Sequence, residues 1–228
     1  MDTGNDYRIL VAEDALKRLQ EIFRSRKFRF PFKYNEYQPL IDKCQKFLQT
    51  IRYCYLELED ILKMTELTEL QATSQKIEKI ITDQIKKVNY QAKEPKEKIT
   101  LLELEYIFVI LKGLVRRLQD PPDPAFALDT FAVQVSNVSK HPKSKNLFIC
   151  RTSDGKKIWQ IVTNISTIKK DQIFPAVHLP PVLFDNVMSE AMFVSNESIS
   201  KEPGDVIKPS GSLLNNINGQ VFTLLKKK

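Results

Sequence analysis

Apolar residues recur every three or four positions through the first half of the chain, which predicts amphipathic helices. The stripes cover about 7–25, 36–64, 77–88 and 100–118. The second stripe is the longest and continues from Leu40 to Leu62. It predicts a single helix from about Glu36 to Met64, roughly 45 Å long at 1.5 Å per residue. Four such helices in sequence predict an antiparallel bundle.

Two helix boundaries are predicted from single residues. Pro95 is expected to end the third helix, because proline removes a backbone donor. Thr100 and Glu103 have the spacing of a capping box, so the fourth helix is expected to begin at Thr100. The length of the second helix also favours a dimer formed along the helices.

The period of the pattern changes from 3.6 to 2 after the segment Asp120-Pro-Pro-Asp-Pro124. Alternation at Phe131, Val133 and Val135 predicts a half-buried strand. Four more strands are expected at 147–152, 158–163, 173–179 and 191–195. Asp154-Gly155 is expected to form a two-residue hairpin turn, and Pro180-Pro181 to separate the last two strands. Five short strands suit a small closed barrel of the OB-fold type.

The chain is therefore predicted to be an α+β multidomain protein. Residues 1–120 would form an N-terminal antiparallel helical bundle, which serves dimerisation or partner docking. Residues 121–130 would form a proline-rich linker. Residues 131–228 would form a C-terminal OB-fold β-barrel.

Three short segments of the barrel region resemble a known family. They read HPKSKNLF at 141–148, WQIVTNIS at 159–166 and NVMSEAMFV at 186–194. The region is similar to the tRNA-binding domain of EMAP II-like proteins, of the C-terminus of some methionyl-tRNA synthetases and of free-standing bacterial tRNA-binding proteins. That family has an OB-fold and binds tRNA. Its usual loop sequence, Asn-Ala-Asp-Lys, is here Lys143-Ser144-Lys145-Asn146, and Ala191 replaces a usual glycine.

Composition changes this interpretation little. The net charge of +7 comes from 35 basic and 28 acidic residues and suggests an anionic partner, although many soluble proteins are equally basic. Three cysteines, an odd number in apolar settings, indicate a reducing cytoplasm. No signal peptide is visible at the N-terminus. The apolar run from Leu101 to Leu114 is interrupted by charges, so no membrane partner is expected.

We expect no enzyme activity, no cofactor and no metal. His141 and His178 lie far apart in sequence without ligand partners at metal-binding spacing. The sequence has no glycine-rich phosphate loop and no histidine paired with a nucleophile.

Residues on the barrel loops and strands are the main candidates for RNA contact. Exposed lysines can contact phosphates, and a tryptophan can stack on an unpaired base. The alternatives are a solvated loop for the lysines, a core position for the tryptophan, and strand packing or strand ending for the others. The candidates are Lys143, Lys145, Asn146, Lys156, Lys157, Trp159, Asn164, Ser189 and Met192.

A second candidate lies between the first two helices, where basic and aromatic residues alternate. This pattern can grip RNA, but it also fits a helix–helix corner capped by aromatic side chains. The basic residues are Arg24, Arg26, Lys27, Arg29 and Lys33.

Two functions are compatible with these observations. In the first, the protein binds tRNA or another structured RNA by its backbone and shape, as an accessory to an aminoacyl-tRNA synthetase or as a homodimer through the helical domain. In the second, a degenerate barrel serves as a peptide-binding chaperone or protein-interaction module. RNA that co-purifies with the protein would favour the first.

Overall fold

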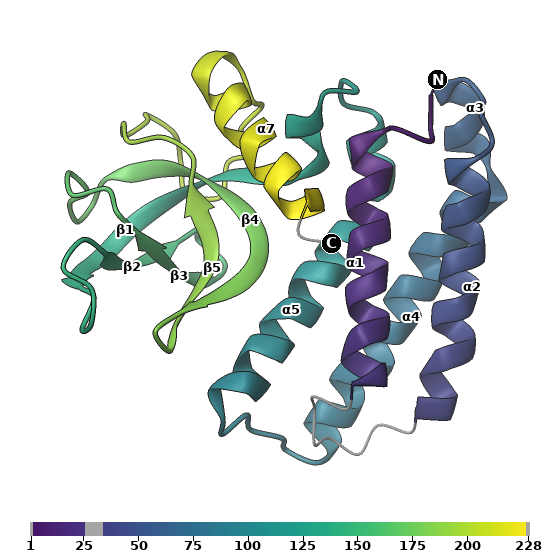
Figure 1. Cartoon of the computed structure of the whole chain (residues 1–228), viewed down its shortest axis with the longest axis horizontal. Coiled ribbons are helices and arrows are strands. Elements are labelled where there is room, and N and C mark those ends of the chain that lie inside the picture. The colour runs from purple at the N-terminus through teal and green to yellow at the C-terminus, as the bar shows by residue number, and fades with distance from the viewer. Residues whose placement is uncertain (1, 26–33, 227–228) are drawn as a thin grey trace. The chain divides into compact units, whose positions relative to one another are not determined.

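The computed structural model describes residues 2–25 and 34–226, which fold as helices followed by a five-stranded sheet (Figure 1). The chain divides into two compact units between Ala127 and Leu128. The first, the helical unit, contains α1 (Tyr7–Arg24), α2 (Tyr34–Arg52), α3 (Leu58–Lys63), α4 (Thr65–Lys87), α5 (Pro95–Lys112), α6 (Leu114–Leu118) and the 3₁₀-helix η1 (Pro124–Ala127). The second, the sheet unit, contains β1 (Thr130–Lys140), β2 (Phe148–Ser153), β3 (Ile158–Thr163), β4 (Ile173–Phe184), β5 (Val187–Phe193) and α7 (Gly211–Lys226).

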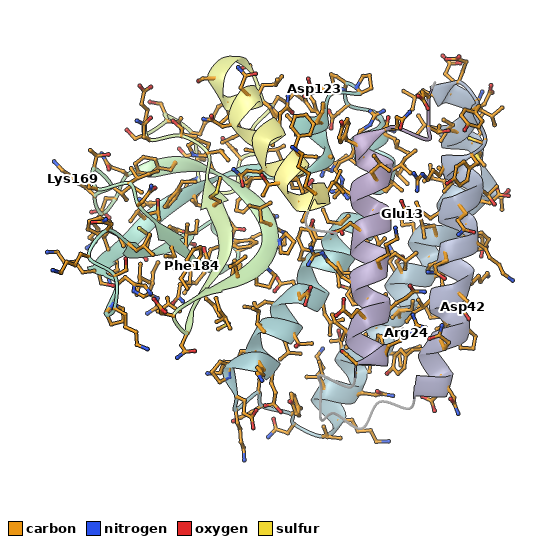
Figure 2. All side chains as sticks on the ribbon, viewed as in Figure 1. Glu13, Arg24, Asp42, Asp123, Lys169 and Phe184 are labelled. Atoms are coloured by element: carbon orange, nitrogen blue, oxygen red, sulfur yellow. The ribbon has the colours of Figure 1, made fainter. Side chains whose placement is uncertain are left out.

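The predicted helical bundle is confirmed. Its long helices α1, α2, α4 and α5 pack in a ring, each against two of the others. The apolar stripes face inward: Leu19 on α1, Ile41 on α2 and Ile77 on α4 are all fully buried. Charged side chains join neighbouring helices outside this core, as where Glu13 of α1 (Figure 2) accepts a 2.5 Å hydrogen bond from Arg52 of α2.

The predicted long helix over 36–64 is wrong, because the chain breaks between α2 and α3. Tyr55 adopts a left-handed conformation with φ +51°. The hydroxyl of Thr3 donates to the Arg52 carbonyl at 2.7 Å and accepts from the Tyr55 amide at 3.4 Å. Because Thr3 is distant in sequence, apolar periodicity could not reveal this helix end. The break removes the observation on which the homodimer was predicted.

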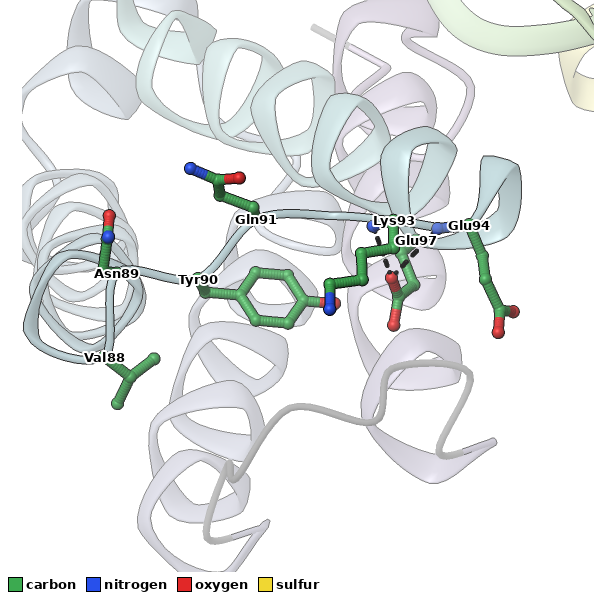
Figure 3. A pocket seen from close by; sticks show the side chains of 7 residues that line it. All are labelled: Val88, Asn89, Tyr90, Gln91, Lys93, Glu94 and Glu97. Atoms are coloured by element: carbon green, nitrogen blue, oxygen red, sulfur yellow. Dashed lines mark hydrogen bonds between the residues drawn. The ribbon is translucent and has the colours of Figure 1, made fainter.

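The start of α5 also differs from the expected one at Thr100. Pro95 is the first residue of α5, a position where its missing N–H costs nothing. The Glu97 carboxylate turns back and accepts hydrogen bonds from the amides of Lys93 (2.9 Å) and Glu94 (3.2 Å), as Figure 3 shows. The Thr100 hydroxyl instead donates to the Lys96 carbonyl inside the helix. The proline expected to end one helix therefore begins the next.

A buried arginine joins the two ends of the helical unit. Arg8 is 1% exposed and pairs with Asp6, the N-cap of α1, through Nε–Oδ1 at 2.9 Å and Nη2–Oδ2 at 2.5 Å. Its Nη1 donates to the carbonyls of Arg117 (3.3 Å), Leu118 (3.2 Å) and Asp120. One guanidinium thus binds three carbonyls at and just beyond the end of α6. η1 also packs on α1, so the helical unit extends to Ala127.

The sheet has the strand order β3-β2-β1-β4-β5, with every neighbouring pair antiparallel. Its inner face buries an apolar core that includes Val133, Phe174 and Phe193. The outer strands β3 and β5 lie together through side chains: Gln160 Nε2 donates to Met188 O (2.8 Å), and Val162 N donates to Ser189 Oγ (2.9 Å). The sheet is curled in the sense of the predicted barrel, but no backbone ladder closes it.

Three details of the sheet differ from the sequence prediction. β4 continues through Pro180-Pro181 instead of ending at Leu179, because its register with β5 shifts between His178 and Val182, where no ladder donor is required. β5 consequently begins at Val187 and not at residue 191. Asp154–Lys157 forms a four-residue loop, whereas the two-residue turn is Asp185-Asn186, with φ +46° and +73°.

Substituting Arg8 should destabilise the helical unit. Arg8→Ala leaves the Asp6 carboxylate buried without its cation, which should lower the free energy of unfolding by about 3–5 kcal/mol. Lys17→Ala is the matched control, since it removes an exposed i,i+4 pair with Glu13 and should cost below about 1 kcal/mol. Helical circular dichroism in urea measures both changes. Equal losses in the two variants would contradict the role given to Arg8.

Candidate nucleic-acid interface

A buried histidine orders the loop between β1 and β2. His141 is 4% exposed, and its Nδ1 accepts hydrogen bonds from the amides of Lys143 (3.2 Å) and Ser144 (3.1 Å). An acceptor Nδ1 leaves the proton on Nε2, which donates to the Phe184 carbonyl at 3.0 Å. One neutral imidazole therefore holds the β1–β2 loop beside the β4–β5 hairpin. The side chains of Lys143, Lys145 and Asn146 are exposed on this loop.

The candidate lysines lie at the two ends of β2. Lys143 and Lys145 precede this strand, whereas Lys156 and Lys157 follow it. The six residues of β2 span about 20 Å at about 3.3 Å per residue. The candidate lysines therefore occupy two loops at opposite ends of one strand and do not share a single loop cluster.

Two further basic residues are exposed near β2, one in the middle of the strand and one at the end that follows Lys143 and Lys145. Arg151 lies in the middle of β2 with an exposed side chain, between the buried Cys150 and Thr152. Lys140 is exposed at the end of β1, where it pairs with Phe148 of β2. The alternation of buried and exposed positions in β2 would have identified Arg151 from sequence. Together Lys140, Lys143, Lys145, Arg151 and Lys156 form an exposed series along β2, which we call the basic stripe.

Lys157 differs from these residues because it is bound within the protein. Its Nζ lies 2.9 Å from Glu190 Oε2 and 4.2 Å from the centre of the Trp159 ring. Glu190 Oε1 also accepts from the Gln160 amide at 3.3 Å. Lys157 therefore helps to join β3 to β5, and its charge is partly neutralised by Glu190.

Trp159 occupies the core, which was the alternative stated for it. The side chain is 6% exposed, with the rings of Phe131 and His178 each 4.9 Å away. The indole Nε1 donates to Asp154 Oδ2 at 3.0 Å. In this position Trp159 offers no open face to a base.

The other three candidates differ in exposure to solvent. Ser189 is buried, and its hydroxyl accepts from Val162 N and donates to Ala191 O at 3.0 Å. Met192 is half-buried in β5 opposite Val177. Asn164 is exposed directly after β3, at the same end of the sheet as Lys143, because Thr163 pairs with Phe148.

Of the second candidate segment, Arg24 lies exposed in the last turn of α1 (Figure 2). Arg26, Lys27, Arg29 and Lys33 lie outside the described residues.

Asp154 organises the loop at the far end of β2. Oδ1 accepts from the amides of Lys156 (2.9 Å) and Lys157 (2.7 Å), while Oδ2 accepts from Trp159. Burial alone would raise the pKa of Asp154, but these hydrogen bonds favour the ionised form and outweigh it. The pKa of this carboxyl therefore lies below its ordinary value of 3.8.

Comparison with known proteins supports this division of the chain. Residues 1–120 match the family described as "Alpha helical domain". The chain belongs to this alpha helical domain family. Residues 132–216 of this family member match a second description, "Putative tRNA binding domain". A search of curated proteins gives no match. The tRNA-binding resemblance predicted from three short segments is confirmed, and the match covers β2 and the flanking residues that carry the basic stripe.

Neither family description names a catalytic activity. Across residues 2–25 and 34–226, every helix is too short or too polar to span a lipid bilayer. In the same part of the chain, no group of three or more His, Cys, Asp or Glu side chains is placed to hold a metal ion.

Replacing Asp154 should destabilise the sheet unit in a pH-dependent way. Asp154→Asn removes the charge and one acceptor, which should cost about 1–3 kcal/mol near pH 6. Because the folded-state pKa is depressed, the stabilisation is present above the ordinary pKa and is lost as the pH falls below it. The difference between the native protein and the variant should therefore shrink at acidic pH.

Trp159 is the only tryptophan, so its fluorescence during urea unfolding reports on this unit. Asp171→Asn is the control, since Asp171 is exposed at φ +68°, a conformation that asparagine also adopts. A stability difference for Asp154→Asn that stays constant down to strongly acidic pH would rule out this role of the carboxylate.

Proposed function

We propose that the sheet unit binds tRNA, or another structured RNA of similar shape, and that the protein acts without catalysis. The observation that carries this proposal is the placement of the basic stripe in and around β2, within the matched tRNA binding domain. Residues 121–228 contain 13 basic and 9 acidic residues, a net charge of +4. The charge is therefore modest overall, and its arrangement matters more than its amount.

The stripe is suited to phosphates more than to bases. Its members are four lysines and one arginine with exposed side chains, spread over both ends and the middle of β2. Such cations position an RNA backbone and carry little sequence information. A contact length of about 20 Å matches several phosphates along one strand. Recognition would then rest on RNA shape, as is usual for structured RNA.

The helical unit would supply a partner site, with an aminoacyl-tRNA synthetase as the proposed partner. Tyr53 and Tyr55 support this because they are 56% and 63% exposed in the α2–α3 connection, and tyrosine is enriched at protein interfaces. A homodimer is the competing proposal. Light scattering on the full chain separates them, since a mass of 26.4 kDa would contradict the homodimer.

Free Cys44, Cys54 and Cys150 support placement in the cytoplasm.

The alternative of a peptide-binding barrel loses its main support. An open tryptophan on the barrel would suit peptide binding, but the side chain of Trp159 is buried among Phe131, His178 and Lys157.

Removing two lysines of the stripe should weaken RNA binding through lost phosphate contacts. For Lys143→Ala/Lys145→Ala, the slope of log K against log salt should flatten by about 1.4–1.8, at about 0.7–0.9 counterions per contact. Preference among tRNAs should not change. Fluorescence anisotropy with total tRNA over a salt series measures both quantities.

Lys76→Ala/Lys79→Ala is the matched control, because it removes two exposed lysines from α4 of the helical unit. This control should leave affinity and slope unchanged. If the control weakened binding while the stripe variant did not, the RNA would bind the helical unit and the proposal would fail.

A further inference from the structure

The end of the sheet that carries Lys143 and Lys145 also presents an exposed aromatic ring. Phe184, labelled in Figure 2, is 37% exposed at the last position of β4. Val182, two residues earlier and therefore on the same side of the strand, is 44% exposed. Most phenylalanines are buried, because apolar surface left in water is unfavourable in free energy. A ligand that covered the Phe184 ring would remove this surface from water.

The ring is held on a rigid support. Phe184 pairs with Val187 across the two-residue turn Asp185-Asn186, in which both residues have positive φ, as in a type I′ turn. Its carbonyl accepts the hydrogen bond from His141 Nε2, and the same imidazole binds the Lys143 amide. A single side chain thus connects the aromatic position to the phosphate-binding loop.

The charges around the ring favour an anionic occupant. The exposed ionisable residues on the adjoining loop and turn are Lys140, Lys143, Lys145 and Asp185, so cations exceed anions by three to one. Exposed amides at Asn146, Asn164 and Asn186 add hydrogen-bonding groups without charge. An exposed apolar ring on a hairpin that His141 joins to a loop with lysines and amides suits a nucleotide, whose base stacks while its phosphate is neutralised.

We infer that Phe184 is a stacking platform for an unpaired base of the bound RNA. The inference rests on the proposed function and narrows it to structured RNA with an unpaired nucleotide next to a duplex. Bases inside an A-form duplex are already stacked on one another, so a fully paired RNA has none to offer. The stripe binds the phosphates of either RNA, whereas Phe184 distinguishes between them.

The test compares two RNAs in fluorescence anisotropy: a blunt-ended duplex of two complementary strands, and the same duplex with a short 3′ single-stranded extension. The native protein should bind the extended RNA more tightly. Phe184→Ala should lose about 5- to 150-fold in affinity for the extended RNA, the range expected for one stacked base. Its affinity for the blunt duplex, and the salt slope for both RNAs, should stay unchanged.

Two further variants separate stacking from apolar contact and from folding. Phe184→Leu keeps an apolar side chain without a π-face and should lose affinity like Phe184→Ala, whereas Phe184→Tyr should retain it. Trp159 fluorescence in urea checks that each variant folds. Equal binding of the extended RNA by all variants, or an equal loss on both RNAs, would overturn the inference while leaving RNA binding intact. If the native protein bound neither RNA, the proposed function itself would fail.

Discussion

The sheet unit depends on the way its two outer strands are joined. β3 and β5 lie side by side without a backbone ladder, and side chains of Gln160, Ser189 and Glu190 supply the hydrogen bonds instead. An open sheet edge exposes unpaired backbone groups and is a template for unwanted pairing. The contact between β3 and β5 therefore covers the free edges of both strands and encloses the core around Ile161 and Phe193.

The segments that reveal the family are largely parts of this support. Gln160 lies in 159–166, Ser189 and Glu190 lie in 186–194, and His141 begins 141–148. Each of these side chains hydrogen-bonds a backbone group of another segment of the sheet unit. Short motifs can identify this fold because a polar side chain that replaces a missing ladder bond has few chemical alternatives. The cations of the basic stripe are subject to no such geometric requirement.

Much of the architecture could be predicted from the sequence. Apolar spacing predicted the bundle, and the change of period located the sheet. Errors arose where distant residues decide the local structure: Thr3 ends α2, and a register shift with β5 lets Pro180 and Pro181 stay within β4. Nothing in the local sequence around Tyr55 or Leu179 records those partners.

For the candidate site too, features set by the local sequence could be predicted, whereas features set by tertiary packing could not. Exposure of Lys143 and Lys145 follows from their position in a polar loop. The burial of Trp159 and the exposure of Phe184 depend on which way a curled sheet turns each side chain. A sequence contains aromatic residues of both kinds, and only the packed structure shows which ring is left open.

The buried Arg8 has a consequence for how the protein is made. Its carbonyl partners lie 109–112 residues further along the chain. During synthesis the first helix can form as soon as it emerges, but its guanidinium remains hydrated until the end of the helical unit has left the ribosome. Contacts so distant in sequence form late and slow the folding of the unit that contains them. The β1–β2 pairing, by contrast, needs only a few residues between its strands, so the sheet unit can begin to assemble locally.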